Sequence, residues 1–244
     1  MGKLHRIVLL LLFAAGWVNA MPTLTVATDV WPPFRILQPD GQLQGIDIEI
    51  LHRLEQESGI RLQVKRMPWG RALKQMQTGQ VDLMIGLAHT PERAQFIDYL
   101  QPAYYQCWPA FYGKREQVAR FDQYSHLLGV KVGFVLNSAY FEPFDSDIRL
   151  DKHGVATEDQ LLRMVQRGHL PLMIGTDCQV DYALSREPAL ALAKAPYRPA
   201  RPITLYLGMS KRSSYQDLKL PLAQALQTLV VNGEIQQIAR PYQP

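Results

Sequence analysis

The chain has 244 residues, of which 47% are hydrophobic and 20% are charged, and its formal net charge is +4. This length and apolar content are enough to build one large core or two smaller ones. The basic residues are scattered singly and no aromatic-and-basic pattern is present, which argues against a nucleic-acid-binding protein.

The first twenty residues have the pattern of a secretory signal peptide. Lys3 and Arg6 form a positive start, residues 7–15 are apolar, and Val18-Asn19-Ala20 is a cleavage site of small residues. The apolar run is too short to cross a bilayer core of about 30 Å, although an uncleaved membrane anchor is the alternative. We therefore expect cleavage after Ala20, which lowers the positive charge by two, and a soluble periplasmic chain.

The first half of the mature chain is predicted to alternate between strands and helices. In chain order we expect a strand at 23–28, a proline-rich loop at 29–34, a turn at Asp40-Gly41, a helix capped by Asp47 and ended by Gly59, and a strand at 60–65. This alternation is typical of a doubly wound α/β sheet.

A helix, a glycine and a short apolar run occur twice in the chain. Residues 72–86 contain the first copy and residues 161–175 the second. Gly79 and Gly168 are predicted to supply the left-handed residue that ends each helix. Each apolar run suits a strand that is buried on both faces and ends at the next glycine. Two such units predict two similar α/β lobes, with the ligand beyond the carboxyl ends of their strands.

The second half continues this pattern. We expect extended segments at 108–112 and 129–136, a capping box formed by Thr157 and Gln160, a strand at 203–209 and a helix that stops at Asn232-Gly233. The chain would cross between the lobes near residues 106 and 202. Lobe 1 is therefore predicted to comprise 21–105 and 203–244, and lobe 2 to comprise 106–202, with a two-segment hinge between them.

Cys107 and Cys178 are the only cysteines of the chain. In an exported protein two cysteines favour one disulfide, and two buried free thiols are the alternative. Their spacing excludes the close clustering of a zinc ribbon, and we expect no metal site.

Several short motifs of the first half occur together in one known family. The segments are Trp31-Pro32-Pro33-Phe34, Asp40-Gly41, Gly45-Ile46-Asp47, Gly79-Gln80-Val81-Asp82 and Thr90-Pro91-Glu92-Arg93. In order and spacing they resemble the family 3 bacterial extracellular solute-binding proteins, the periplasmic receptors of polar amino acid ABC importers. The resemblance covers the mature chain and is stronger in the first lobe than in the second.

This resemblance implies a fold and a function. The fold would be the two-lobed type II periplasmic-binding-protein fold, with two doubly wound sheets and a hinge near which both cysteines lie. The protein would be a monomer without a cofactor that captures an amino acid or a related small carboxylate and delivers it to the membrane subunits of an ABC importer.

The resemblance also assigns the carboxylate end of the ligand. Thr90 and Pro91 suit a helix start, and the unpaired N–H groups there attract an anion. Arg93 and the backbone N–H near Ala88 would hold the ligand carboxylate, because the guanidinium offers a fork that matches it. The alternative for Arg93 is an exposed position on a solvated helix turn.

Two tryptophans and an acidic residue complete the first-lobe set. Trp31 and Trp69 would enclose the ligand side chain between two flat faces, although either could be a core residue. Asp29, beside the Trp31 motif, is included with them as a ligand-binding candidate.

The second lobe departs from the family pattern. Ser138 lies in the loop after the strand at 129–136, where it contacts the ligand or serves a plain turn. Asp177 comes one residue later than the aspartate that the family uses for the ligand amino group. It either holds that group or caps a helix.

Two further functions remain open on the sequence. An exported enzyme on the same fold, such as one that resembles cyclohexadienyl dehydratase, would need a base, and His89, His153 and His169 are isolated in the chain. A ligand receptor that reports to a membrane sensor would use the same cleft, since lobe closure creates the surface that either partner contacts.

Overall fold

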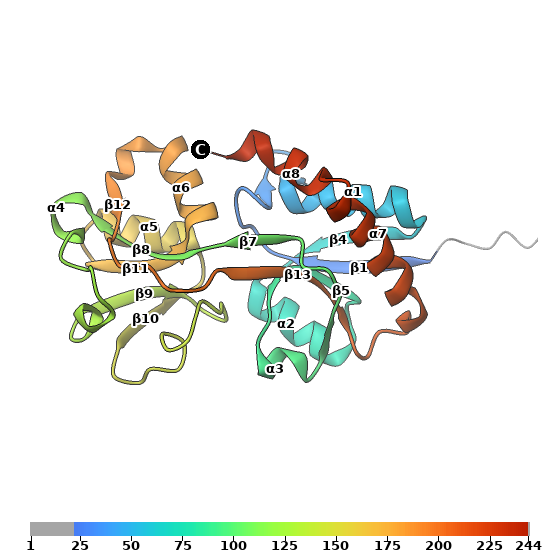
Figure 1. The fold of residues 1–244 in the computed structure, drawn as a ribbon, viewed down its shortest axis with the longest axis horizontal. Helices are drawn as coiled ribbons and strands as arrows, with labels where there is room; N and C mark the ends of the chain where they lie inside the picture. The colour runs from blue at the N-terminus through green and yellow to red at the C-terminus, as the bar shows by residue number, and fades with distance from the viewer. Residues whose placement is uncertain (1–21, 244) are drawn as a thin grey trace, which may run out of the picture.

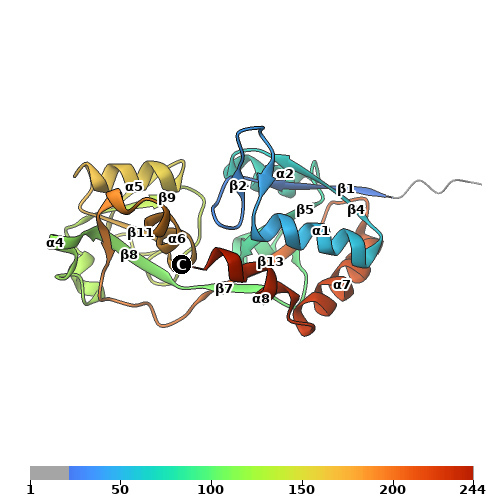
Figure 2. The same cartoon turned by 90° about the horizontal axis from the view of Figure 1, so that it is seen from above.

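The structure, a computed structural model, describes residues 22–243, so the expected signal peptide lies outside the described residues. Two α/β lobes lie side by side, each built on its own sheet (Figures 1 and 2). The predicted two-lobed α/β architecture is confirmed. Every helix within residues 22–243 is too short or too polar to cross a membrane.

The sheet of lobe 1 has the strand order β4-β1-β5-β13-β6, and β7 also pairs with β13. The strands are β1 (Thr23–Thr28), β4 (Arg61–Arg66), β5 (Leu83–Ala88), β6 (Ile97–Tyr99), β7 (Tyr105–Cys107) and β13 (Ile203–Ser210). β1 runs parallel to β4 and β5, whereas β13 is antiparallel to β5. A small hairpin of β2 (Ile36–Leu37) and β3 (Leu43–Gln44) surrounds the predicted turn at Asp40-Gly41.

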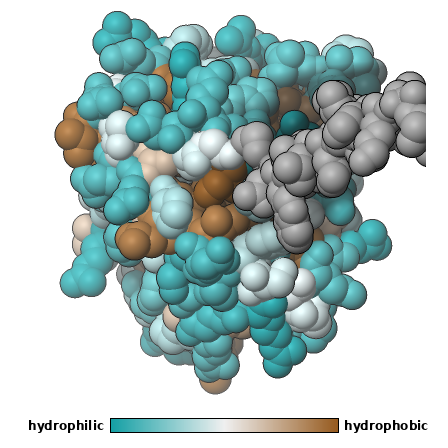
Figure 3. Space-filling model, turned by 90° about the vertical axis from the view of Figure 1, so that its right-hand side faces the viewer, coloured by the Kyte–Doolittle hydropathy of each residue, from teal (hydrophilic) through white to brown (hydrophobic). Residues whose placement is uncertain are grey.

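Helices cover both faces of this sheet (Figure 1). One face carries α1 (Ile46–Ser58), α7 (Lys219–Val231) and α8 (Glu234–Ala239), and the other carries α2 (Trp69–Thr78) and the short α3 (Pro91–Ala94). The apolar stripe of α1 is buried through Ile50, Leu51 and Leu54, as its spacing predicts. The outer end of the lobe presents mostly hydrophilic residues to solvent (Figure 3).

The sheet of lobe 2 has the order β10-β9-β11-β8-β12. Its strands are β8 (Pro109–Lys114), β9 (Lys131–Val135), β10 (Asp151–Val155), β11 (Leu172–Thr176) and β12 (Leu192–Lys194). Its helices are α4 (Arg115–Val118), α5 (Glu158–Gln166) and α6 (Asp177–Arg186), with 3-10 turns at Tyr124–Leu127 and Pro188–Leu190. Two further 3-10 turns, Gln216–Leu218 and Arg240–Tyr242, flank the last helices of lobe 1.

The repeated helix-glycine-strand unit occupies the same place in both lobes. Gly79 (φ 77°) and Gly168 (φ 78°) are both left-handed where the helix ends, as predicted. The strands that follow, β5 and β11, each lie between one parallel and one antiparallel neighbour. The prediction that these strands end at the next glycine is wrong, because β5 continues to Ala88 and β11 to Thr176.

β7 and β13 pair antiparallel and run side by side between the lobes (Figures 1 and 2). Cys107, at the end of β7, forms a disulfide with Cys178 at the start of α6, with 5.6 Å between their Cα atoms. The predicted disulfide is therefore present, and it ties the interlobe strand to a helix of lobe 2.

The helix start expected at Asp47 is wrong. Gly45 occupies the N-cap position of α1, and Asp47 lies in the first turn with its side chain fully buried. The carboxylate is used in a buried ion pair, described below, and so does not cap the helix. Several short elements, among them β6, β10, β12, α4 and α8, follow no pattern that we recognised in the sequence.

Candidate functional site

A cavity of about 110 Å³ lies between the lobes and is lined by residues of both. Six of the eight predicted ligand-binding residues lie on its wall, namely Asp29, Trp31, Trp69, Ala88, Arg93 and Ser138. The wall also contains residues that the sequence did not single out, among them Arg35, Tyr140, Glu158, Thr176 and Gln179. The predicted residues therefore converge from distant parts of the chain on this cavity.

Arg93 reaches the cavity from the short helix α3. The Thr90 hydroxyl accepts a hydrogen bond from the Arg93 backbone N–H (3.2 Å), and Pro91 takes the first helical position, as the sequence predicts. Arg93 is only 8% exposed, and its guanidinium donates to the carbonyls of Ala88 (2.9 Å) and Asn137 (2.8 Å). Burial lowers the pKa of Arg93, but an arginine side chain stays charged in proteins. Thr90 itself caps the helix and is not on the cavity wall.

The two tryptophans belong to the first-lobe part of the wall. Trp31 stacks on Phe34, with 4.4 Å between ring centroids, and its Nε1 donates to Gln179 of α6. Trp69 donates from Nε1 to the Asn137 carbonyl (3.1 Å). Both rings flank the Arg35 guanidinium, at 5.0 Å and 5.8 Å from its central carbon. The aromatic wall is therefore already held by cation–π contacts and by hydrogen bonds to lobe 2.

Asp29 links the loop after β1 to the start of α2. One carboxylate oxygen accepts from the Trp69 backbone N–H (3.0 Å) and the other from the Val30 N–H (2.8 Å). Its backbone carbonyl accepts from Arg35 Nε (2.9 Å). Asp29 therefore lies on the cavity wall and also fixes the positions of both tryptophan loops.

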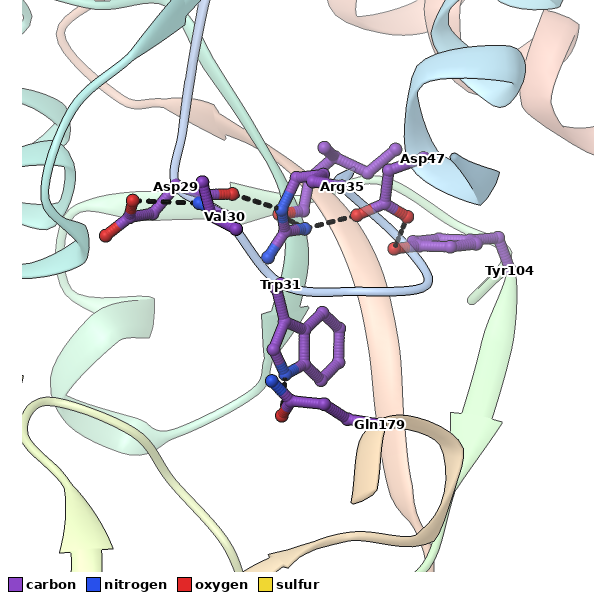
Figure 4. A network of polar contacts seen from close by, with 8 residues as sticks. Asp29, Val30, Trp31, Arg35, Asp47, Tyr104 and Gln179 are labelled. Atoms are coloured by element: carbon purple, nitrogen blue, oxygen red, sulfur yellow. Dashed lines mark hydrogen bonds and ion pairs between the residues drawn. The ribbon is translucent and has the colours of Figure 1, made fainter. Parts of the chain in front are cut away.

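A buried charge network that the sequence did not predict supports this wall (Figure 4). Arg35 forms an ion pair with Asp47 through Nη1, and the side chains are 3% and 0% exposed. The other Asp47 oxygen accepts from the Tyr104 hydroxyl (2.7 Å). Burial raises the pKa of Asp47, whereas the Arg35 guanidinium and the Tyr104 hydroxyl lower it. Because both charges are enclosed and paired, Arg35 is held firmly beneath Trp31 and Trp69.

The second-lobe wall is formed by the loop after β9 and by the first residues of α5 and α6. Asn137 has a left-handed backbone (φ 62°), and Ser138 follows it on the wall. Thr157 caps α5 by accepting from the Gln160 N–H (3.3 Å), which confirms the predicted helix start. The next residue, Glu158, also lies on the wall, and burial raises the pKa of its carboxyl to about 8.

Asp177 lies off the cavity wall. Its Oδ1 accepts from the backbone N–H groups of Trp108 (2.8 Å) and Cys178 (2.7 Å). Both bonds lie where α6 begins and meets the start of β8. The sequence offered a helix cap as one of two roles for Asp177, and the structure places it next to the cap, as the first residue of α6.

The lobes contact one another directly at the cavity. Three hydrogen bonds join them, from Trp31 to Gln179, from Trp69 to Asn137 and from Arg93 to Asn137. Side chains that line the cavity thus also form hydrogen bonds between the two lobes.

Residues missed by the sequence analysis carried weak local signals. Arg35 directly follows the Pro-Pro-Phe segment, which was predicted to be a loop. Glu158 directly follows Thr157, which was predicted to cap a helix. An acidic residue in a first helical turn is ordinarily exposed and stabilised by the helix dipole. Nothing local distinguishes Glu158 from such a residue.

Comparisons with known proteins agree with this architecture. A substrate-binding protein of an amino acid ABC transporter from Streptococcus pneumoniae, bound to L-arginine, superposes with a TM-score of 0.78 at 22% identity, over 90% of this chain and 94% of that one. A histidine kinase sensor domain with similarity to periplasmic binding proteins superposes with a TM-score of 0.81 at 17% identity, over 91% and 96% of the two chains. At these identities the likenesses establish the fold.

Sequence comparison establishes the family. A putative ABC transporter arginine-binding protein of Escherichia coli is 24% identical over 229 residues, which cover 90% of each chain. The profile of the bacterial extracellular solute-binding proteins, family 3, matches residues 24–244. The chain therefore belongs to the family 3 bacterial extracellular solute-binding proteins.

Proposed function

We propose that this protein binds an amino acid or a related small carboxylate in the cavity between its lobes. In this proposal it acts in the periplasm after loss of residues 1–20 and delivers the ligand to the membrane subunits of an ABC importer. Binding, with no chemical conversion, is favoured because the sequence relatives and the arginine-bound structure are binding proteins.

The observation that carries the proposal is the position of Arg93. Its guanidinium is nearly buried on the cavity wall, where its only acceptors among residues 22–243 are the backbone carbonyls of Ala88 and Asn137. No carboxylate side chain lies within ion-pair distance of it in that part of the chain. A buried cation without an acidic partner is costly, and a ligand carboxylate would supply that partner.

The rest of the wall supports a small, partly apolar ligand. Trp31 and Trp69 offer flat faces that suit aliphatic, aromatic or cationic groups. Arginine and histidine are the ligands named for the matched relatives, and both carry such groups beside a carboxylate.

A thermal-shift screen of the exported protein tests the proposal. The protein would first be partly unfolded and dialysed to remove copurified ligand, then heated with each standard L-amino acid and with small mono- and dicarboxylates. A ligand at 100 times its Kd stabilises the folded state by about 2.7 kcal/mol, which raises the melting temperature by several degrees. Agmatine, the decarboxylated form of arginine, is the matched control and should give no shift. A screen in which no carboxylate shifts the melting temperature would contradict the proposal.

A further inference from the structure

One end of the Arg35 guanidinium has no partner within the described chain. Nε donates to the Asp29 carbonyl (2.9 Å), and Nη1 donates to the Asp47 carboxylate and to the Ile85 carbonyl (3.3 Å). Nη2 carries two further N–H donors and makes no hydrogen bond to any of residues 22–243. Because buried polar groups are almost always paired, free donors on a side chain that is 3% exposed indicate an acceptor from outside the chain.

The free end of Arg35 borders the interlobe cavity. Three side-chain atoms within residues 22–243 are both unpartnered and sealed from open space, and Nη2 of Arg35 is not among them. Nη2 therefore retains accessible surface, and Arg35 belongs to the cavity wall. In Figure 4 this nitrogen points away from Asp47, on the side of the guanidinium nearer to Trp31. The two free donors are thus available to a molecule in the cavity.

The fold holds this guanidinium in one orientation. Gly86 of β5 has a left-handed backbone (φ 80°), and a Cβ there would collide with Arg35 Nη1, so the glycine makes room for the side chain. The Asp47 carboxylate is itself fixed by the Tyr104 hydroxyl (2.7 Å). With Nε and Nη1 both bound, the direction of the Nη2 donors is set before a ligand arrives, which is the preorganisation that favours selective binding.

Arg35 and Arg93 lie around the same aromatic ring. Their Cζ atoms are 5.8 Å and 6.0 Å from the ring centroid of Trp69, and both residues line the cavity. A single small molecule in this space can therefore contact both guanidinium groups.

The two guanidinium groups differ in the partner that they require. Arg93 has no acid within ion-pair distance among residues 22–243, so its charge calls for an anion. Arg35 is already neutralised by Asp47. Its free end therefore needs only an oxygen atom that accepts a hydrogen bond, whether that oxygen is charged or neutral.

We propose that Nη2 of Arg35 donates to an oxygen at the end of the ligand opposite its carboxylate, and that Arg35 thereby determines which ligands are accepted. This role rests on the proposed function, in which Arg93 holds the ligand carboxylate. It narrows the ligand class to carboxylates that carry a second oxygen acceptor, such as an amide or a second carboxylate. Arginine, the ligand named for one matched relative, is disfavoured because its side chain ends in a cation that offers Nη2 no acceptor.

The selectivity has a physical basis in desolvation. A ligand that enters the cavity replaces the water that hydrogen-bonds to free donors on its wall. A ligand oxygen restores that hydrogen bond, whereas a methyl group leaves charged donors buried and unpaired. Sites built to hydrogen-bond a ligand group reject the analogue that lacks it far more strongly than an apolar pocket rejects a change of size.

Calorimetry with pairs of ligands of similar shape tests this role of Arg35. Each pair keeps the carboxylate and replaces the distal acceptor with a branched hydrocarbon: L-asparagine with L-leucine, L-glutamine with L-homoleucine, and glutarate with 5-methylhexanoate. In the wild type, loss of the acceptor should weaken binding at least about ten-fold in the pairs that bind. L-Lysine, whose side chain ends in a cation, should bind more weakly than L-glutamine.

Two variants and a matched control assign the effect. Arg35→Lys keeps a charge for Asp47 but has no second nitrogen, so the penalty for losing the acceptor should shrink to about three-fold or less. Arg35→Met combined with Asp47→Asn removes both charges together, so no buried charge is left uncompensated, and the same reduction is expected even where Arg35→Lys fails to fold. Arg71→Lys makes the conservative change at an exposed arginine of α2 and should keep the wild-type penalty.

The outcomes separate this role from the proposed function. Equal affinities within each pair in the wild type would overturn the role of Arg35 and leave the carboxylate site standing. An equal acceptor penalty in wild type and the Arg35 variants overturns it too, because the ligand oxygen would then be bound elsewhere. If no carboxylate of either kind binds, the proposed function fails and the role of Arg35 fails with it.

A crystal structure of the complex gives a second readout that a purely structural role would not produce. Nη2 of Arg35 should lie about 2.7 to 3.2 Å from an oxygen of the bound ligand, with Nη1 still paired with Asp47. A ligand carbon against Nη2, or a ligand oxygen bound only by other residues, would contradict the assignment.

Discussion

Replacing Arg93 with alanine is expected to weaken ligand binding by about thirty-fold or more, which corresponds to the loss of about 2 to 5 kcal/mol for a charged partner in a buried pair. Arg93 is 8% exposed and its guanidinium has no acidic partner on the cavity wall, so a bound carboxylate in Arg93→Ala would be buried without its counter-charge. Isothermal titration of the strongest ligand from the screen measures the change.

Two further variants show whether the loss of affinity in Arg93→Ala comes from the paired N–H donors of the guanidinium. Arg93→Lys retains the charge but not the planar pair of donors, so its affinity should fall between those of wild type and Arg93→Ala. Arg53→Ala, which removes an exposed arginine from the surface of α1, should bind like wild type. Affinity in Arg93→Ala equal to that of wild type would show that the carboxylate lies elsewhere.

Replacing Asp47 with alanine is expected to lower the free energy of unfolding by about 3 to 5 kcal/mol, because removal of one partner leaves a buried charge uncompensated. Arg35, at 3% exposure, would lose its ion pair, and the Tyr104 hydroxyl would lose its acceptor. Urea unfolding of the ligand-free protein measures this effect. Glu49→Ala is the matched control, since Glu49 is an exposed acid in the same first turn of α1.

The control variant should lose no more than about 1 kcal/mol, the value of an exposed acid at a helix start. A similar, small loss in Asp47→Ala would mean that the Arg35–Asp47 pair contributes little beyond the packing around it. Asp47→Asn should fall between the two, because its amide can still accept from Tyr104 but no longer carries the charge.

Local patterns predicted the elements of this fold well. The two glycines that end the repeated helices are left-handed, the Thr90 and Thr157 caps form as expected, and the buried runs become the central strands β5 and β11. Each of these features depends on residues within one or two turns of the chain, so the sequence contains the necessary information.

The charges on the cavity wall could not be predicted in this way. Asp47 was expected to cap a helix, but its partner is Arg35 in the preceding loop, and the pair is closed by Tyr104 from beyond β6. Glu158 has the ordinary position of an exposed first-turn acid, yet it is half-buried on the cavity wall and its Oε1 fills the space beside Gly175. Burial of these groups is set by contacts between distant segments, which a local pattern does not record.

The most direct test of the carboxylate site is a comparison of the strongest amino acid ligand with its carboxamide, titrated calorimetrically against wild type and Arg93→Ala. Amidation removes the negative charge with little change in shape. We expect it to weaken binding to wild type by about thirty-fold or more and binding to Arg93→Ala by only a few-fold, since the two changes remove the same interaction. An equal loss on amidation in both proteins would contradict the assignment of Arg93 to the ligand carboxylate.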